Sequence, residues 1–142
     1  MQIDGLHILL VEDNLLNLQV LDDMLRSLGH APLSTSTVAE ALEAIRRQSF
    51  DLILTDLHMP DAGGAHLLQA LRAMDQFHPP VVLVTADLMS EDVRDRLRLG
   101  FADVLPKPIR LADLERVITM AEERRRADAR SLFSRGDRVR AG

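Results

Sequence analysis

Three short runs of apolar residues, none of them alternating with polar residues, stand out along the chain. They are residues 8–11 (ILLV), 52–54 (LIL) and 81–84 (VVLV). An unbroken apolar run of this length is typical of a strand that is buried on both faces of a parallel sheet. Two shorter, more polar segments, 33–35 and 103–105, are predicted to be strands that are less buried. We therefore expect five strands, three of them central.

A helical pattern follows each predicted strand. Asn14 is a favourable N-cap for a helix that is closed by Gly29 at a C′ position. Thr37 and Glu40 have the spacing of a capping box, which opens the next helix. Ser90 caps a later helix that ends at Gly100. The five helices are predicted over about 15–28, 38–47, 64–74, 91–100 and from 111 onward.

Strict alternation of strands and helices predicts an α/β fold with one parallel sheet. The crossovers should be right-handed and the helices should cover both faces. Because the first, third and fourth strands are the most apolar, we expect them in the centre, with the second and fifth at the edges. The predicted strand order is 2-1-3-4-5, the doubly wound, flavodoxin-like order, with its switch point between the first and third strands.

The helix over residues 15–28 is apolar on more than one side. Leu15, Leu18 and Leu25 form one stripe, while Val20 and Met24 lie elsewhere on the helix. We interpret Val20 and Met24 as partly exposed residues on a docking surface for a helical partner or a second copy of the chain. The alternative is that both pack on a neighbouring helix.

The composition excludes several classes of function. The chain has no cysteine, so disulfides, thiol catalysis and a thiolate zinc site are ruled out. No apolar run approaches the roughly 18 residues of a membrane span, and the first residues do not have the pattern of a signal peptide. The expectation is one cytoplasmic domain without membrane contact of its own.

Charge divides the chain into two parts. Residues 1–120 carry a net charge of −8 and residues 121–142 a net charge of +3, which together give −5. An acidic body disfavours nucleic acid as a ligand. We expect residues 1–120 to be the folded domain. Residues 121–142 should be an Arg-rich extension of the last helix that frays into a linker or disordered tail.

Chemically distinctive residues follow four of the predicted strands. Glu12 and Asp13 end the first strand, Asp56 the third and Thr85 the fourth, while Lys107, the only lysine among 17 basic residues, follows the fifth. Three carboxylates that converge would repel one another unless a cation joins them. Oxygen ligands favour magnesium, with manganese as an alternative, and a hydroxyl and an ammonium suit phosphate oxygens. The pattern predicts phosphoryl transfer with an aspartate as nucleophile.

These motifs resemble the receiver domain of two-component response regulators over about residues 6–120. The matching segments are Leu10-Val-Glu12-Asp13-Asn14, Asp56-Leu-His-Met-Pro60 with Gly64, Thr85-Ala86 and Lys107-Pro108. The resemblance implies that Asp56 accepts a phosphoryl group from a phosphohistidine of a histidine kinase or a histidine phosphotransfer domain. It also implies that the domain is a signalling receiver, catalysing only its own phosphorylation and autodephosphorylation. The receiver could stand alone or belong to a membrane-bound hybrid kinase, and a homodimer is a further expectation.

The resemblance also assigns roles to individual residues. Asp13 and Asp56 would bind magnesium directly with the backbone carbonyl of His58, and Glu12 would act through water. Thr85 would bond the phosphoryl oxygens. Lys107 would pair with Asp56 and then with the phosphate, and a cis peptide would join Lys107 to Pro108.

Two departures from the family pattern concern signalling and hydrolysis. The family usually has an aromatic residue three positions before the lysine, where this chain has Val104. We therefore expect a small phosphorylation-dependent change around this switch position. His58 and Asp87 occupy the positions that would flank the attacking water.

Three other functions remain as alternatives. A degenerate receiver would bind a partner without phosphorylation, but it should lack part of the site. A haloacid-dehalogenase-like phosphatase needs an acid two residues after the nucleophile, where this chain has His58. A dinucleotide-binding enzyme needs a glycine-rich turn after the first strand, and Glu12-Asp13-Asn14 occupies that place.

Overall fold

The computed structural model describes residues 5–57, 59, 61, 64–74, 78–86 and 100–141. Within these residues there are five strands and four helices. They are β1 (His7–Val11), α1 (Leu15–Ser27), β2 (Ala31–Thr35), α2 (Val38–Arg47), β3 (Leu52–Asp56), α3 (Gly64–Ala73), β4 (Val81–Thr85), β5 (Asp103–Pro106) and α5 (Leu111–Ala141). The helix predicted between Ser90 and Gly100 lies outside the described residues.

The five strands form one parallel sheet in the order β2-β1-β3-β4-β5. The predicted strand order is confirmed, and so is the prediction that the two weakly apolar segments lie at the edges. Every residue of β4 is buried, as is every residue of β3 except Asp56. The sheet therefore presents polar groups mainly at its ends, where the loops begin.

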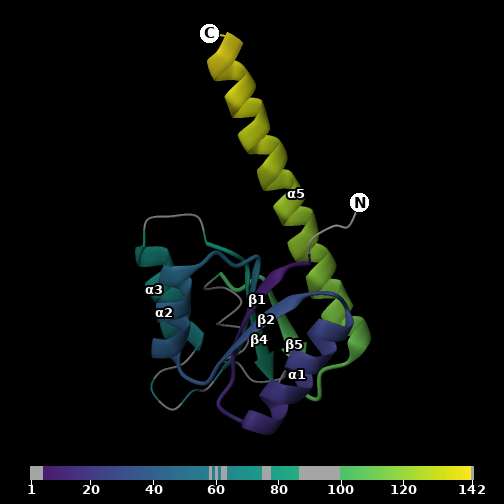
Figure 1. Ribbon diagram of the computed structural model, residues 1–142. Coiled ribbons are helices and arrows are strands. Elements are labelled where there is room, and N and C mark those ends of the chain that lie inside the picture. The colour runs from purple at the N-terminus through teal and green to yellow at the C-terminus, as the bar shows by residue number, and fades with distance from the viewer. Residues whose placement is uncertain are drawn as a thin grey trace.

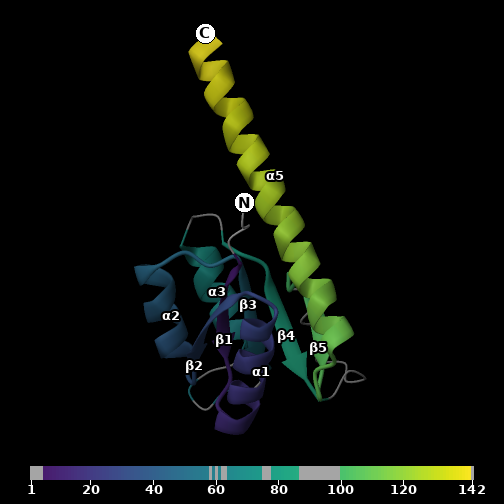
Figure 2. The same ribbon diagram turned by 45° about the vertical axis from the view of Figure 1, so that its right-hand side comes forward.

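Helices cover both faces of the sheet, as Figures 1 and 2 show. α1 and α5 pack on one face, through Leu18, Leu21, Leu25, Leu114, Val117 and Ile118. α2 and α3 pack on the other face, through Val38, Ala41, Ala44, Leu67, Leu68 and Leu71. Alternate residues of each strand enter the two cores, because successive side chains of a strand point to opposite faces.

The predicted helix ends on either side of β2 are present in the structure. The Asn14 side chain accepts a hydrogen bond from the amide of Asn17. α1 is closed by Gly29, which has a φ of 90°, a conformation that costs glycine little. Its amide donates to Arg26 O, and the His30 amide to Leu25 O, which is the Schellman pattern. The Thr37 hydroxyl accepts from the Glu40 amide.

The apolar stripe on α1 is buried at two of its three positions. Leu18 and Leu25 are buried, but Leu15 is 73% exposed. Leu15 is the first residue of α1. Leu16 and Val20 are also exposed, at 71% and 52%, while Met24 packs partly against the core. The predicted partial exposure of Val20 and Met24 is confirmed.

α5 extends well past the sheet and carries the C-terminus away from the body (Figure 1). Ala121 is still buried in the core. Arg125 lies one turn further on, and its Nη1 is 3.7 Å from Asp51 Oδ2 and 3.4 Å from Gly5 O. The division of the chain at residue 120 stays a prediction. Of the helices described, none combines the length and the apolar character that crossing a membrane requires.

Candidate functional site

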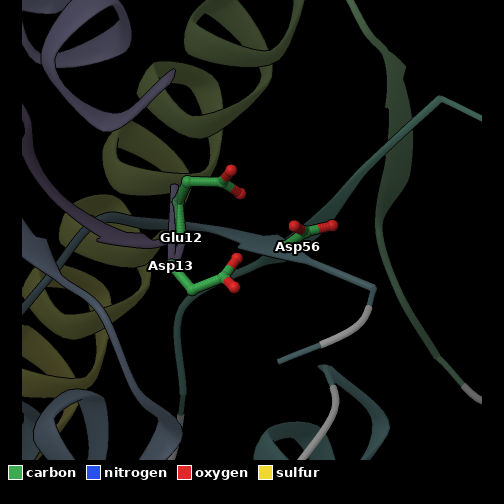
Figure 3. Close-up of side chains that lie close together, drawn as sticks. All are labelled: Glu12, Asp13 and Asp56. Carbon is green, nitrogen blue, oxygen red and sulfur yellow. The ribbon is translucent and has the colours of Figure 1, made fainter. Parts of the chain in front are cut away.

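Three carboxylates meet at the carboxyl ends of β1 and β3. Val11 lies opposite Thr55 in the sheet, so Glu12 and Asp56 leave their strands at the same level. One carboxylate oxygen from each of Glu12, Asp13 and Asp56 lies within 4.8 Å of the other two. Figure 3 shows the three side chains directed toward a common space. The sequence predicted this convergence, and the switch point between β1 and β3 produces it.

Two donors hold the carboxylate of Asp56. The amide of Leu57 donates to Oδ1 at 2.8 Å, and the ammonium of Lys107 donates to Oδ2 at 3.1 Å. The Asp56 side chain is 16% exposed, so it is oriented by the protein and still reachable from solvent. A half-open, hydrogen-bonded carboxylate is suited to act as a nucleophile.

Backbone pairing brings Lys107 and Thr85 to the same rim. Thr85 lies opposite Pro106 in the sheet, and the Lys107 amide donates to Thr85 O at 2.9 Å. The peptide bond between Lys107 and Pro108 is cis, as the resemblance implied. The Lys107 ammonium also lies 3.3 Å from Glu12 Oε2, so one cation links the ends of three strands.

The electrostatics of the site follow from crowding at this rim. Burial raises the pKa of Glu12, and the neighbouring Asp56 raises it further, although hydrogen bonding by Asn17 and the charge of Lys107 act in the opposite direction. For Lys107, burial would lower the pKa, but the hydrogen bond and attraction of Asp56, together with Glu12, outweigh it, and the pKa is raised. The negative charge of Glu12 is thus incompletely compensated, while the Lys107 ammonium is firmly charged.

We expect Glu12→Gln to stabilise the metal-free protein. The pKa of Glu12 in the folded chain lies above 4.5, so the folded state binds this proton more tightly than the unfolded state. That contribution favours folding at low pH and is lost as the pH rises through the raised pKa. At pH 7 the neutral amide should raise the melting temperature by about 2–5 °C, as measured by thermal denaturation in EDTA.

Measuring Glu12→Gln at low pH provides the control. Below the unfolded pKa of Glu12 both proteins have a neutral side chain, so the difference in melting temperature should disappear there. A variant that melts at or below the wild-type temperature at pH 7 would contradict the assigned charge penalty at Glu12.

The acid cluster fits a hard divalent cation. Carboxylate oxygens from neighbouring strand ends are ligands that magnesium accepts, and it keeps several waters in its coordination shell. Asp13 is exposed and Asp56 half-buried, which leaves room for those waters. Among the described residues, Glu12, Asp13 and Asp56 are the ones that could hold the ion. The predicted backbone ligand His58 lies outside the described residues, as does Asp87.

Two contacts at the site were missed by the sequence reasoning. The side-chain Nδ2 of Asn17 donates to Glu12 Oε1 at 3.1 Å, from the first turn of α1. Asn17 stands three residues after the N-cap Asn14, and that spacing near the acids was a usable signal. The Asp61 carboxylate accepts from the amides of Val38 and Ala39. These partners lie 23 and 22 residues away in the chain, so no local sequence pattern predicts the contacts.

Val104, at the switch position, and two histidines outside the site have defined contacts in the structure. Val104 is partly buried and packs against the core beneath α2 and α3. His30 accepts the Leu6 amide through Nδ1 at 3.0 Å, and the His78 ring lies 2.8 Å from Pro79 O. These two contacts are structural and involve no residue of the candidate site.

The family model for the response regulator receiver domain matches residues 8–119. The chain belongs to this family. The receiver domain is a signalling domain of two-component systems, and the fold described above is its fold.

Solved receiver domains show the same architecture. The receiver domain of the sensor histidine kinase PA1611 from Pseudomonas aeruginosa, whose crystal structure has magnesium coordinated in the active-site cleft, is 34% identical. Its TM-score is 0.74, covering 82% of this chain and 96% of that one. The Saccharomyces cerevisiae response regulator Ssk1, solved with the phosphotransfer protein Ypd1, has a receiver that is 26% identical, with a TM-score of 0.75 over 84% and 90% of the chains.

Curated relatives are much longer proteins that include a matching segment. The sensor histidine kinase RcsC of Escherichia coli is 32% identical over 121 residues, which is 85% of this chain and 13% of RcsC. The transcription factor SKN7 of Saccharomyces cerevisiae is 31% identical over 114 residues, which is 80% of this chain and 18% of SKN7. The chain therefore spans less than a fifth of these relatives.

Proposed function

We propose that this receiver takes a phosphoryl group from a phosphohistidine onto Asp56 in a magnesium-dependent reaction, and that it signals by changed partner binding. The observation that carries the proposal is the convergence at one rim. Three carboxylates lie within 4.8 Å of one another, and Lys107 Nζ lies 3.1 Å from Asp56 Oδ2. The alternative from the sequence is a degenerate receiver that binds partners without phosphorylation. Such a protein would not need all three carboxylates and Lys107.

Each residue has a defined task in the proposed reaction. A carboxylate oxygen of Asp56 forms a bond to phosphorus as the bond between phosphorus and the imidazole nitrogen breaks, and the electron pair stays with that nitrogen. Lys107 and Thr85 donate hydrogen bonds to the oxygens of the transferred group. Glu12, Asp13, Asp56 and the carbonyl of His58 would hold magnesium, which supplies positive charge to offset that of the phosphoryl oxygens.

A small-molecule phosphodonor tests the proposal without a partner protein. Incubation with phosphoramidate or acetyl phosphate and magnesium should add about 80 Da, the mass of one phosphoryl group, to the intact protein. The same mixture with EDTA in place of magnesium should add none. An unchanged mass under both conditions would refute phosphoryl acceptance.

The exposed apolar residues of α1 are the proposed contact surface for the phosphodonor. Leu15, Leu16 and Val20, which we call the α1 patch, are more than half exposed. Leu16 and Val20 also line a cleft of about 300 Å³ that reaches Asp56 and Lys107. An apolar rim beside the nucleophile suits the helical bundle of a phosphotransfer domain or kinase, since buried apolar anchors dominate such interfaces.

Leu16→Gln and Val20→Gln should slow transfer from a phosphorylated histidine phosphotransfer domain by about tenfold or more, the typical effect of losing an interface anchor. Phosphorylation by phosphoramidate should be unchanged, because neither side chain touches Asp56 in the described contacts. Leu33→Gln is the matched control, since Leu33 is 39% exposed on the edge strand β2. Equal slowing with both donors would contradict the docking role. A patch that serves a second copy of the chain would show as a change in oligomeric state instead.

Val104 limits the conformational response to phosphorylation. Its side chain is short, and branching at Cβ restricts χ1, so it has no large group to move between exposed and buried positions. We expect beryllofluoride binding to change amide hydrogen exchange strongly around Asp56 and only weakly across residues 90–105. Protection changes over residues 90–105 that match those at Asp56 would show a switch that works without an aromatic residue.

A further inference from the structure

Asp61 joins the loop after the phosphoacceptor to the start of α2. Its Oδ1 accepts the amide of Val38 at 3.1 Å and its Oδ2 accepts the amide of Ala39 at 3.1 Å. Both amides belong to the first turn of the helix, where backbone donors have no partner within the helix. A carboxylate at this end is also favoured by the helix dipole, and bonds from amides to an ionised group are comparatively strong.

The start of α2 is itself fixed to the end of β1. The Glu12 amide donates to Thr35 O at 3.0 Å, and the Thr35 hydroxyl, which is buried, donates to Leu10 O at 2.6 Å. Thr35 lies three residues before α2 begins at Val38. The first turn of α2 is therefore held beside the strand end that supplies the acids Glu12 and Asp13.

The loop that carries Asp61 starts at the nucleophile. Leu57, whose amide donates to Asp56 Oδ1, is only 6% exposed and lies in the same core as Val38. Met59 packs partly against that core. Asp61 follows two residues later and is exposed. Its two hydrogen bonds to α2 therefore form at the surface and are not forced by the burial of a polar group. Together these contacts close a ring from Asp56 through α2 and Thr35 back to Glu12.

We propose that Asp61 is a positioning residue for the magnesium site. By tying the loop to α2, it fixes the distance between the loop segment after Asp56 and the acids at the end of β1. Asp56 on one side of that gap and Asp13 on the other would bind the same ion, so a chain that is less restrained after Asp56 must be ordered when the ion binds. This inference rests on the proposed function, because it concerns the cation that supports phosphorylation of Asp56.

The test measures magnesium affinity of the unphosphorylated protein by isothermal titration calorimetry. Asp61→Ala should weaken magnesium binding by on the order of tenfold, the lower end of the range for residues that orient metal ligands. Asp61→Asn, which keeps one amide-accepting oxygen, should fall between the wild type and Asp61→Ala. The rate of phosphorylation at saturating magnesium should recover toward that of the wild type in both variants.

Two control variants separate positioning from stability and from charge. Thr37→Ala removes a cap of the same helix without touching the loop, since Thr37 accepts the Glu40 amide. It should lower the melting temperature by about 3–5 °C and leave magnesium affinity unchanged. Glu40→Gln removes one negative charge near the same helix end, where Glu40 accepts from Ser36 and Thr37. It too should leave magnesium affinity unchanged.

The outcomes are distinct. Weakened affinity in the Asp61 variants alone supports the inference. Affinity equal to wild type in Asp61→Ala overturns it, and so does an equal loss in Thr37→Ala or Glu40→Gln. If the wild-type protein binds no magnesium and takes up no phosphoryl group, the proposed function fails and the inference with it. A wild type that is phosphorylated beside an unaffected Asp61→Ala refutes the inference alone.

Discussion

Asp56→Asn should give a folded protein that takes up no phosphoryl group from phosphoramidate, acetyl phosphate or a phosphohistidine donor. Asparagine has nearly the same shape and keeps one oxygen that can accept from Leu57, although its NH2 group cannot accept from Lys107 as the wild-type carboxylate does; the two donors hold that carboxylate at 2.8 and 3.1 Å. Its amide is a poor nucleophile, so the phosphorus–oxygen bond cannot form. Intact mass spectrometry should show the wild-type increase of about 80 Da and none in the variant.

Asp51→Asn is the matched control. Asp51 directly precedes β3, which Asp56 ends, and its carboxylate accepts the His7 amide at the opposite end of the strands from Asp56. This variant should be phosphorylated like the wild type, whatever its stability. Labelling that survives in Asp56→Asn would show that another residue accepts the group, and the assignment of the site would then be wrong.

Lys107→Arg should preserve the fold and uncouple phosphorylation from the response of the protein. The lysine places one compact charge 3.1 Å from Asp56 and 3.3 Å from Glu12, in a space where its side chain is only 24% exposed. A guanidinium is planar and larger, and it prefers two parallel bonds to one carboxylate. It should remain bound to an acid instead of following the phosphoryl group. Amide hydrogen exchange with and without beryllofluoride should then show little of the wild-type change beyond Asp56 itself.

Arg110→Lys makes the reverse exchange three residues further on, at an exposed position. It should leave the exchange response intact. An undiminished response in Lys107→Arg would show that a point charge is not required and that the single lysine of the chain stands there by chance.

The sheet could be predicted from sequence because each strand is defined by a short, continuous segment of the chain. Each central strand is an unbroken apolar run, and each strand end is marked by a polar residue such as Glu12, Asp56 or Thr85. Burial placed the two segments with least apolar surface at the edges, and the doubly wound topology that fits this arrangement supplied the strand order. Once the order was known, the convergence of the acids and of Lys107 followed from the geometry of parallel strands.

The parts that failed or were missed depend on contacts between distant segments. Leu15 has the same spacing as the buried residues Leu18 and Leu25, yet at the first position of α1 it is 73% exposed. Asp61 looks like an ordinary loop acid, because its partners Val38 and Ala39 are set by how α2 lies against the loop. Sequence periodicity indicates which face of a helix or strand is apolar. It does not indicate which positions on that face a distant segment covers.

The length of α5 gives the domain a mechanical property. Its 31 residues make a rod about 46 Å long at 1.5 Å per residue. The rod begins at Leu111, four residues after Lys107, and its first turns are clamped against the sheet by Leu114, Val117 and Ile118. Arg125 still contacts Asp51 and Gly5, so the part beyond Arg125 is a lever arm of about 24 Å, and a tilt of about 10° at its base would displace the tip by about 4 Å. A change at the proposed phosphorylation site that is too small to alter the surface of the body would thus be amplified into a displacement at the end of the rod.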